Sequence, residues 1–132
     1  MAIRNVVIHS DGASRNNPGP AAIGATIKDE QGRLLATISR SIGLATNNQA
    51  EYRAVIAALE KAIKLGARQI DLNLDSELIV KQVTGQYRVK NEALKPLFDM
   101  VKKLLGSLEG FSIRHIPRQQ NQEADRLANN AL

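Results

Sequence analysis

The stretch Ile3–Ile8 and the acid that follows it constrain this chain more than any other feature. The stretch is predominantly apolar and short, which predicts a strand buried on both faces. Asp11 follows where we expect this strand to end, ahead of an irregular turn at Pro18–Pro20. An unpaired buried carboxylate is costly, so Asp11 is expected to have a cation or hydrogen-bond donors nearby. The alternative is a turn that Asp11, Asn16 and Asn17 cap among themselves.

The rest of the chain alternates between strand and helix periodicity. Strands are predicted at Ile3–Ile8, Ala22–Lys28, Arg33–Ile42, Gln69–Leu74 and Phe111–Ile116. Helices are predicted at 48–65, Glu77–Thr84 and Gln122–Ala131, and a further one runs to about Leu105 from either Asn91 or a short turn before Pro96. The order βββαβααβα predicts an α/β fold: a five-stranded mixed sheet, strand order 3-2-1-4-5, with helices on both faces.

Composition narrows the class of protein without identifying it. The 132 residues suit one domain, 1–132, and a content of 43% hydrophobic but 3% aromatic residues predicts an aliphatic core. Without cysteine there is neither a disulfide partner nor a zinc–thiolate site. The start lacks a signal peptide's apolar stretch and no run suits a membrane span, so we expect a soluble, cytoplasmic monomer. The formal charge of +5 permits binding to a polyanion, or serves solubility alone.

Four acids lie where the predicted strands end or the predicted helices begin. Asp11 and Asp75 end neighbouring strands, at the edge where open α/β sheets bind ligands. Glu51 and Asp125 each lie in the predicted first turn of a helix that could point over the same edge. Clustered carboxylates raise one another's pKa values, and a hard divalent cation such as Mg²⁺ or Mn²⁺ relieves the conflict. The alternative is that each acid only caps a helix or a turn.

Four motifs, taken in order, resemble those of the type 1 ribonuclease H family. They are Asp11-Gly12-Ala13 with Asn17–Ala25, Thr46-Asn47-Asn48-Gln49-Ala50-Glu51, Leu74-Asp75-Ser76, and Asn121–Ala128. One such motif would be weak, but the four fall on the expected types of element and span nearly the whole chain. The resemblance implies the fold derived above, in a compact member without the basic handle insertion that some bacterial relatives carry.

The resemblance also implies an activity: a metal-dependent endonuclease that hydrolyses the RNA strand of RNA–DNA hybrids, leaving 5′-phosphate and 3′-hydroxyl ends. It implies two Mg²⁺ ions during catalysis, with Mn²⁺ as a substitute. By the same resemblance, Asp11 and Asp125 would hold the ion that activates the attacking water. Asp11, Glu51 and Asp75 would hold the ion that stabilises the leaving 3′-oxygen.

Five polar residues are candidates for contacts with the nucleic acid. Asn17, Asn48 and Gln49 match family positions that touch the hybrid, where small polar groups can read the 2′-hydroxyl of RNA. Thr46 and Asn47 could hold a phosphate near the N-terminus of the first helix. The alternative for all five is capping and turn formation.

The sequence departs from the family pattern in the loop before the last acid. Many relatives carry a histidine there that is thought to help product release. Counting without gaps gives His115, ten residues before Asp125. Aligning Ile116-Pro117 with the end of the strand gives Arg118 instead. We favour Arg118 as the loop cation and interpret His115 as a structural residue that faces a helix.

Two further departures concern substrate binding. Without the handle, binding to a hybrid is expected to be weaker, and Glu77 stands where many relatives have a glutamine that contacts RNA. Two alternatives therefore stay open: a nucleic-acid-binding or accessory domain with low turnover, or the same chemistry on double-stranded RNA or RNA–DNA junctions.

Overall fold

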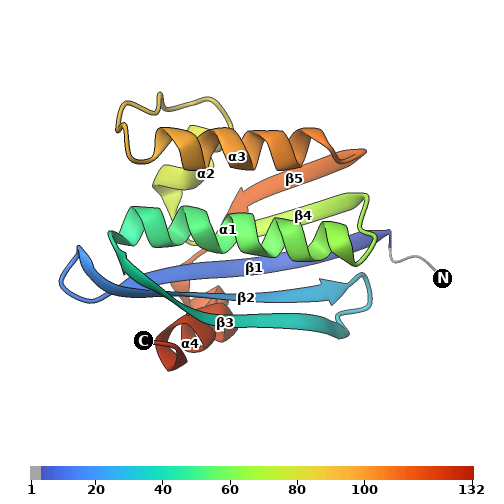
Figure 1. Cartoon of the computed structure of the whole chain (residues 1–132). Coiled ribbons are helices and arrows are strands. Elements are labelled where there is room, and N and C mark those ends of the chain that lie inside the picture. The colour runs from blue at the N-terminus through green and yellow to red at the C-terminus, as the bar shows by residue number, and fades with distance from the viewer. Residues whose placement is uncertain (1–3) are drawn as a thin grey trace.

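The computed structural model describes residues 4–132, which form one five-stranded sheet in the order β3-β2-β1-β4-β5 (Figure 1). The strands are β1 Asn5–Ser14, β2 Gly19–Asp29, β3 Leu34–Ala45, β4 Gln69–Leu74 and β5 Gly110–His115. The helices are α1 Asn47–Lys64, α2 Glu77–Val83, α3 Lys95–Gly106 and α4 Gln122–Asn130, with a 3-10 turn, η1, at Arg118–Gln120. The predicted fold class, element order and strand order are confirmed. Of the first predicted strand, Ile3 lies outside the described residues.

The first strand is longer than predicted, and this moves Asp11 from the end of the strand to its interior. β1 pairs antiparallel with β2 as far as Ser14, but parallel with β4 only as far as Ser10, opposite Leu74. Asp11 is therefore the first β1 residue beyond the end of β4. The expected turn is shorter as well, because β2 already begins at Gly19.

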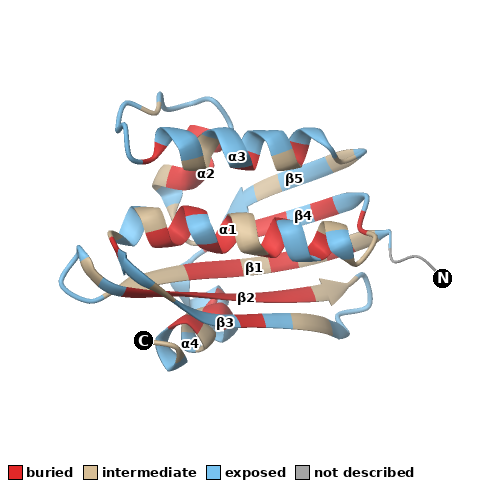
Figure 2. Ribbon diagram, in the orientation of Figure 1, coloured by how far each residue is buried: buried red, intermediate tan, exposed pale blue. Residues whose placement is uncertain are grey.

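Helices cover both faces of the sheet. On one face α1 packs against β1 and β2, and α3 packs against α1; on the other, α4 crosses β1, β2 and β3 (Figure 1). The core between α1 and the sheet is aliphatic, as predicted, with Ile8, Leu59 and Leu72 fully buried. Figure 2 shows burial running along β1, β2 and β4, while α3 is largely exposed. No helix within residues 4–132 is long and apolar enough to cross a bilayer.

The helix starts follow the sequence signals in part. Thr46 caps α1 in a capping box with Gln49, which places Glu51 in the second turn and not the predicted first turn. The alternative of a turn before Pro96 is the correct one, since α3 begins at Lys95 and the Asn91 side chain accepts hydrogen bonds within the preceding turn. Asn121 occupies the N-cap position of α4, but its side chain makes no capping bond.

Two glycines let helices approach the sheet closely from opposite faces. A Cβ at Gly12 would lie 2.3 Å from a backbone carbon of α1, and a Cβ at Gly24 would lie 2.3 Å from a carbonyl oxygen of α4. Gly24 is the ladder partner of Asp11. These contacts bring the helix that carries Glu51 and the helix that carries Asp125 against the strands beside Asp11.

Gly24→Ala tests this close contact. Because the added methyl group has no space, we expect α4 to shift and the free energy of unfolding in urea to fall by about 1–3 kcal/mol. Gly106→Ala is the matched control, because this residue ends α3 with no heavy atom within 4 Å of a new Cβ. The control should be unchanged or more stable by up to about 1 kcal/mol. Equal effects of the two substitutions would contradict the role given to Gly24.

Candidate metal centre

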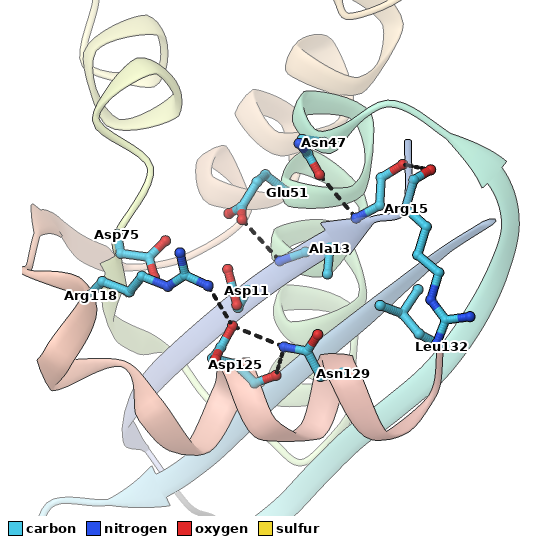
Figure 3. A pocket seen from close by; sticks show the side chains of 12 residues that line it. Asp11, Ala13, Arg15, Asn47, Glu51, Asp75, Arg118, Asp125, Asn129 and Leu132 are labelled. Atoms are coloured by element: carbon cyan, nitrogen blue, oxygen red, sulfur yellow. Dashed lines mark hydrogen bonds and ion pairs between the residues drawn. The ribbon is translucent and has the colours of Figure 1, made fainter. Parts of the chain in front are cut away.

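A polar cavity of about 590 Å³ opens at the carboxyl ends of β1 and β4 (Figure 3). All four acids singled out in the sequence line it. Its lining consists of Asp11, Gly12, Ala13, Ser14, Arg15, Asn47, Glu51, Asp75, Arg118, Asp125, Asn129 and Leu132. The tertiary structure therefore brings together carboxylates from four different elements or their ends, as the prediction required.

Three of these acids converge most tightly. Asp11, Glu51 and Asp75 each place one carboxylate oxygen within 4.8 Å of the others. Asp11 is 5% exposed and Glu51 9%. The ladder with β4 has ended at this point, and the Gly12 amide donates to Oε1 of Glu51 at 3.0 Å. This bond fixes the Glu51 carboxylate against the edge of β1 next to Asp11.

Burial changes the protonation of the two inner acids. Burial is the largest of several effects that together raise the pKa of the Asp11 carboxyl to about 10; the others are hydrogen bonding to Glu51, the negative charge of Glu51 and hydrogen bonding to Asp125. Burial also raises the pKa of Glu51 to about 7, against the opposing effect of hydrogen bonds with Asp11 and the Gly12 amide. At neutral pH without metal, Asp11 therefore keeps a proton that it shares with its neighbours.

The residues present fit a hard divalent cation. Oε2 of Glu51 is buried and has no hydrogen-bond partner among the described residues. Such an orphaned carboxylate oxygen is costly unless a cation or a donor meets it. The donors at this point are all carboxylate oxygens, the ligand type that Mg²⁺ and Mn²⁺ prefer. The alternative that the acids only cap helices fails for Glu51, which lies beyond the first turn.

Asp125 stands beside this trio on the side of α4. Figure 3 shows Asp11 between Glu51, Asp75 and Asp125. Asp125 lies in the first turn of α4, as predicted, and its carboxyl group helps to raise the pKa of Asp11. A guanidinium nitrogen of Arg118 lies 3.5 Å from its Oδ1. Asp125 is therefore a candidate for a fourth carboxylate at this site, and it is paired with a cation.

The two candidates for the loop cation lie in different surroundings. Arg118 begins η1 and lines the acid cavity. His115 ends β5 with an exposed side chain, and it is not among the described residues that line the cavity. Helix α2 carries Glu77, whose pKa is lowered mainly by a hydrogen bond with Lys81 and to a smaller extent by His115. The side chain of His115 is exposed, which argues against the structural role that we expected for it.

Most of the five polar candidates at the start of α1 also act in capping and turns. Thr46 and Gln49 form the capping box, and Oδ1 of Asn17 accepts from the Asn47 amide at 2.8 Å. Oδ1 of Asn47 in turn accepts from the Ser14 amide at 2.9 Å, which ties α1 to the end of β1. Asn47 lines the acid cavity, while Asn17, Thr46, Asn48 and Gln49 line a neighbouring one. Their expected contacts with nucleic acid stay a prediction.

The sequence analysis gave no role at the acid site to two asparagines that lie next to the acids. Asn129 donates from Nδ2 to the backbone oxygen of Asp125 at 2.9 Å and to its Oδ1 at 3.1 Å. The i,i+4 spacing of this pair on one helix was the signal that could have found it. Asn121 begins the last of the four motifs and occupies the N-cap position of α4, but its side chain reaches Asp75. No local pattern indicates that contact, because the two residues lie far apart in the chain.

Comparison with known families agrees with this geometry. Residues 9–131 match the model of a family described as reverse transcriptase-like. The chain is 47% identical over 122 residues to the ribonuclease HI of Halobacterium salinarum. It is 43% identical over 128 residues to a bifunctional protein of Mycobacterium tuberculosis. These alignments cover 92% and 96% of this chain, but the chain spans only 61% and 35% of the two relatives' own lengths.

Solved structures show the same fold. The crystal structure of the Halobacterium salinarum RNase H1 superimposes with a TM-score of 0.94 at 45% identity, covering 96% of both chains. LC11-RNase H1 in complex with an RNA/DNA hybrid gives a TM-score of 0.91 at 41% identity, covering 96% of this chain and 95% of that one.

The crowding of acids predicts how stability depends on pH. The pKa of Asp11 is higher in the folded chain than its usual value of about 4, so the folded state binds the proton more tightly than the unfolded state. Stability without metal should therefore fall as pH rises from about 4 towards 10. Asp11→Asn should flatten this decline and stabilise the metal-free protein at pH 8, by on the order of 1–2 kcal/mol.

Thermal unfolding in EDTA across this pH range measures the effect. Asp99→Asn is the control, because Asp99 forms an exposed ion pair with Lys95 on α3 and its loss should change stability little. A wild-type pH profile retained by Asp11→Asn would show that Asp11 is not the group responsible.

Proposed function

The chain belongs to the ribonuclease H family, and we propose that it hydrolyses the RNA strand of RNA–DNA hybrids, leaving 5′-phosphate and 3′-hydroxyl ends. The observation that carries this proposal is the convergence of Asp11, Glu51 and Asp75 within 4.8 Å, with Asp125 beside them. The hybrid bound to the similar LC11-RNase H1 supports the choice of substrate.

The four acids are proposed to hold two Mg²⁺ ions, with Mn²⁺ as a substitute, and Asp11 would contribute a ligand to each. When bound, such ions activate water and neutralise charge on the phosphate oxygens. The chain's own part is to hold the carboxylates in place: the Gly12 amide orients Glu51, and Asn129 orients Asp125. Asp11 must release its proton to act as a ligand, so metal affinity should increase as pH rises.

Arg118 is proposed to assist product release. Its guanidinium lies 3.5 Å from Asp125, at the mouth of the cavity where the new 5′-phosphate would remain. Arginine forms paired hydrogen bonds to phosphate oxygens, so it can draw this group away from the acids.

Discrimination between RNA and DNA is proposed to arise at the start of α1. Asn48 is exposed there, and Asn47 lines the acid cavity. Amide side chains can both donate to and accept from a 2′-hydroxyl, the group that only RNA carries. The bonds that Asn17 and Thr46 make to α1 hold this segment rigid for such contacts.

The loop between α2 and α3 is the place where the handle is missing. Only residues 84–94 join these helices. A low-turnover binding domain and cleavage of double-stranded RNA or RNA–DNA junctions are the alternatives that the substrate test must separate. The cytoplasmic location, the single-domain organisation and the monomeric state that the sequence suggested stay predictions.

A panel of labelled duplexes tests the proposed activity. We expect a hybrid to be cut in its RNA strand with Mg²⁺ or Mn²⁺, no cleavage in EDTA, and full recovery when metal is restored. Double-stranded RNA, double-stranded DNA and an RNA–DNA junction are the comparison substrates. Asp11→Asn is the inactive control and should lose several orders of magnitude in rate. Cleavage that persists in EDTA would exclude the metal mechanism, and binding of the hybrid without cleavage would favour the accessory-domain alternative.

Arg118→Ala and His115→Ala separate the two loop candidates. Because Arg118 lies at the acid cavity and His115 does not, we expect Arg118→Ala to lower kcat more than KM with an unchanged melting temperature. His115→Ala should change neither activity nor, given its exposed side chain, stability. Steady-state kinetics and a melting curve for each variant decide between them. An inactive, stable His115→Ala beside an active Arg118→Ala would show that the gapless alignment is right.

A further inference from the structure

Asn121 is a buried amide in an unusual place. It lies between η1 and α4, is 1% exposed, and occupies the N-cap position of α4. An asparagine at this position normally accepts a hydrogen bond from the first turn of its helix. Here the side chain makes no such bond, so its contacts need a different explanation.

The side-chain amide of Asn121 bridges the ends of two strands. Nδ2 donates to the backbone oxygen of Ser10 at 2.9 Å and to Oδ2 of Asp75 at 3.3 Å. Ser10 is the last β1 residue paired with β4 and directly precedes Asp11. Asp75 follows the last residue of β4. One amide group thus holds together the two strand ends that carry these acids.

The backbone of Asn121 extends the same connection to the fourth element. Its carbonyl oxygen accepts from the Asp125 amide at 3.1 Å, the first helical bond of α4. Asn121 is therefore bonded to Asp75, to the neighbour of Asp11 and to Asp125. Among the described residues, Asn121 is the one that donates a hydrogen bond to the Asp75 carboxylate.

A tether at this position matters because the sheet cannot supply one. The β1–β4 ladder ends at Leu74, so no strand pairing restrains Asp75. Asp75 also repels Asp11 and Glu51, whose pKa values its charge helps to raise. A carboxylate free to rotate would turn away from these neighbours and towards water.

We propose that Asn121 is a positioning residue that holds Asp75, and through the backbone Asp125, in the arrangement that binds divalent metal. This inference rests on the proposed metal site. Partners that orient a ligand in this way typically change metal affinity by about 10- to 100-fold when they are lost. Asn121 is then a determinant of metal affinity and not merely a helix cap.

Asn73 offers a matched control inside the same sheet. It is also buried, and its Nδ2 also donates to a β1 carbonyl, that of Ile8 at 3.2 Å. Among residues 4–132, the Asn73 amide has no carboxylate partner. Removing it should cost stability in the same way, but it should leave the acids where they are.

The test compares Asn121→Ser with Asn73→Ser by calorimetric titration of Mn²⁺ without substrate. Serine is an accepted N-cap residue, so Asn121→Ser keeps the start of α4 while shortening the side chain that reaches Asp75. We expect its dissociation constant for Mn²⁺ to increase about 10- to 100-fold, and that of Asn73→Ser to stay at the wild-type value. The rise in melting temperature caused by Mn²⁺ should shrink for Asn121→Ser alone. Asn121→Leu, which removes the donor at similar volume, provides a second variant.

The outcomes separate this inference from the proposed function. If the wild-type chain and Asn121→Ser bind Mn²⁺ with the same dissociation constant, the positioning role is overturned but the metal site is not. The positioning role also fails if Asn73→Ser weakens binding as much as Asn121→Ser, because the effect is then general destabilisation. A wild-type chain that binds no Mn²⁺ overturns the metal site and the positioning role with it.

Discussion

The parallel ladder between β1 and β4 stops at Ser10, and the geometry of the acid cavity depends on this early stop. Beyond it, β1 continues with β2 on one side only. The backbone groups there are met by side chains: the Gly12 amide by Glu51, and the Ser10 carbonyl by Asn121. Buried backbone groups must find hydrogen-bond partners, so the groups left unpaired where the ladder ends bond to side chains of the site.

The same arrangement places the site in conflict with stability. Asp11 and Glu51 are buried next to each other and next to Asp75, so the metal-free chain must either protonate them or bear their repulsion. Functional sites often carry such a cost, which the rest of the fold offsets. Here the offset comes from an aliphatic core between α1 and the sheet, in which Ile8 and Leu72 are fully buried. Metal binding would remove the conflict by supplying the missing positive charge.

Rigidity around the acids comes from contacts that also have ordinary structural roles. Gly12 and Gly24 let two helices approach the strands at distances that no side chain would permit. The Asn47 side chain bonds α1 to the end of β1, and the Asn17 side chain bonds the β1–β2 turn to the start of α1. The polar residues predicted to contact nucleic acid are thus held in place by the bonds that begin a helix. Helix capping and nucleic-acid recognition are therefore compatible roles for this segment.

The sequence by itself determined the element order, the strand order and the aliphatic core, and it placed Asp11 and Asp75 at one edge of the sheet. These features follow from local periodicity and from the rules of strand connection, which act over short stretches of chain. Only the tertiary structure decided that Asp11 lies inside a strand, that Glu51 lies in a second turn, and that Asn121 bonds Asp75. The register of strand pairing and the partners of buried polar groups are set between segments far apart in the chain, as Ser10 and Asn121 show, and no local pattern carries that information.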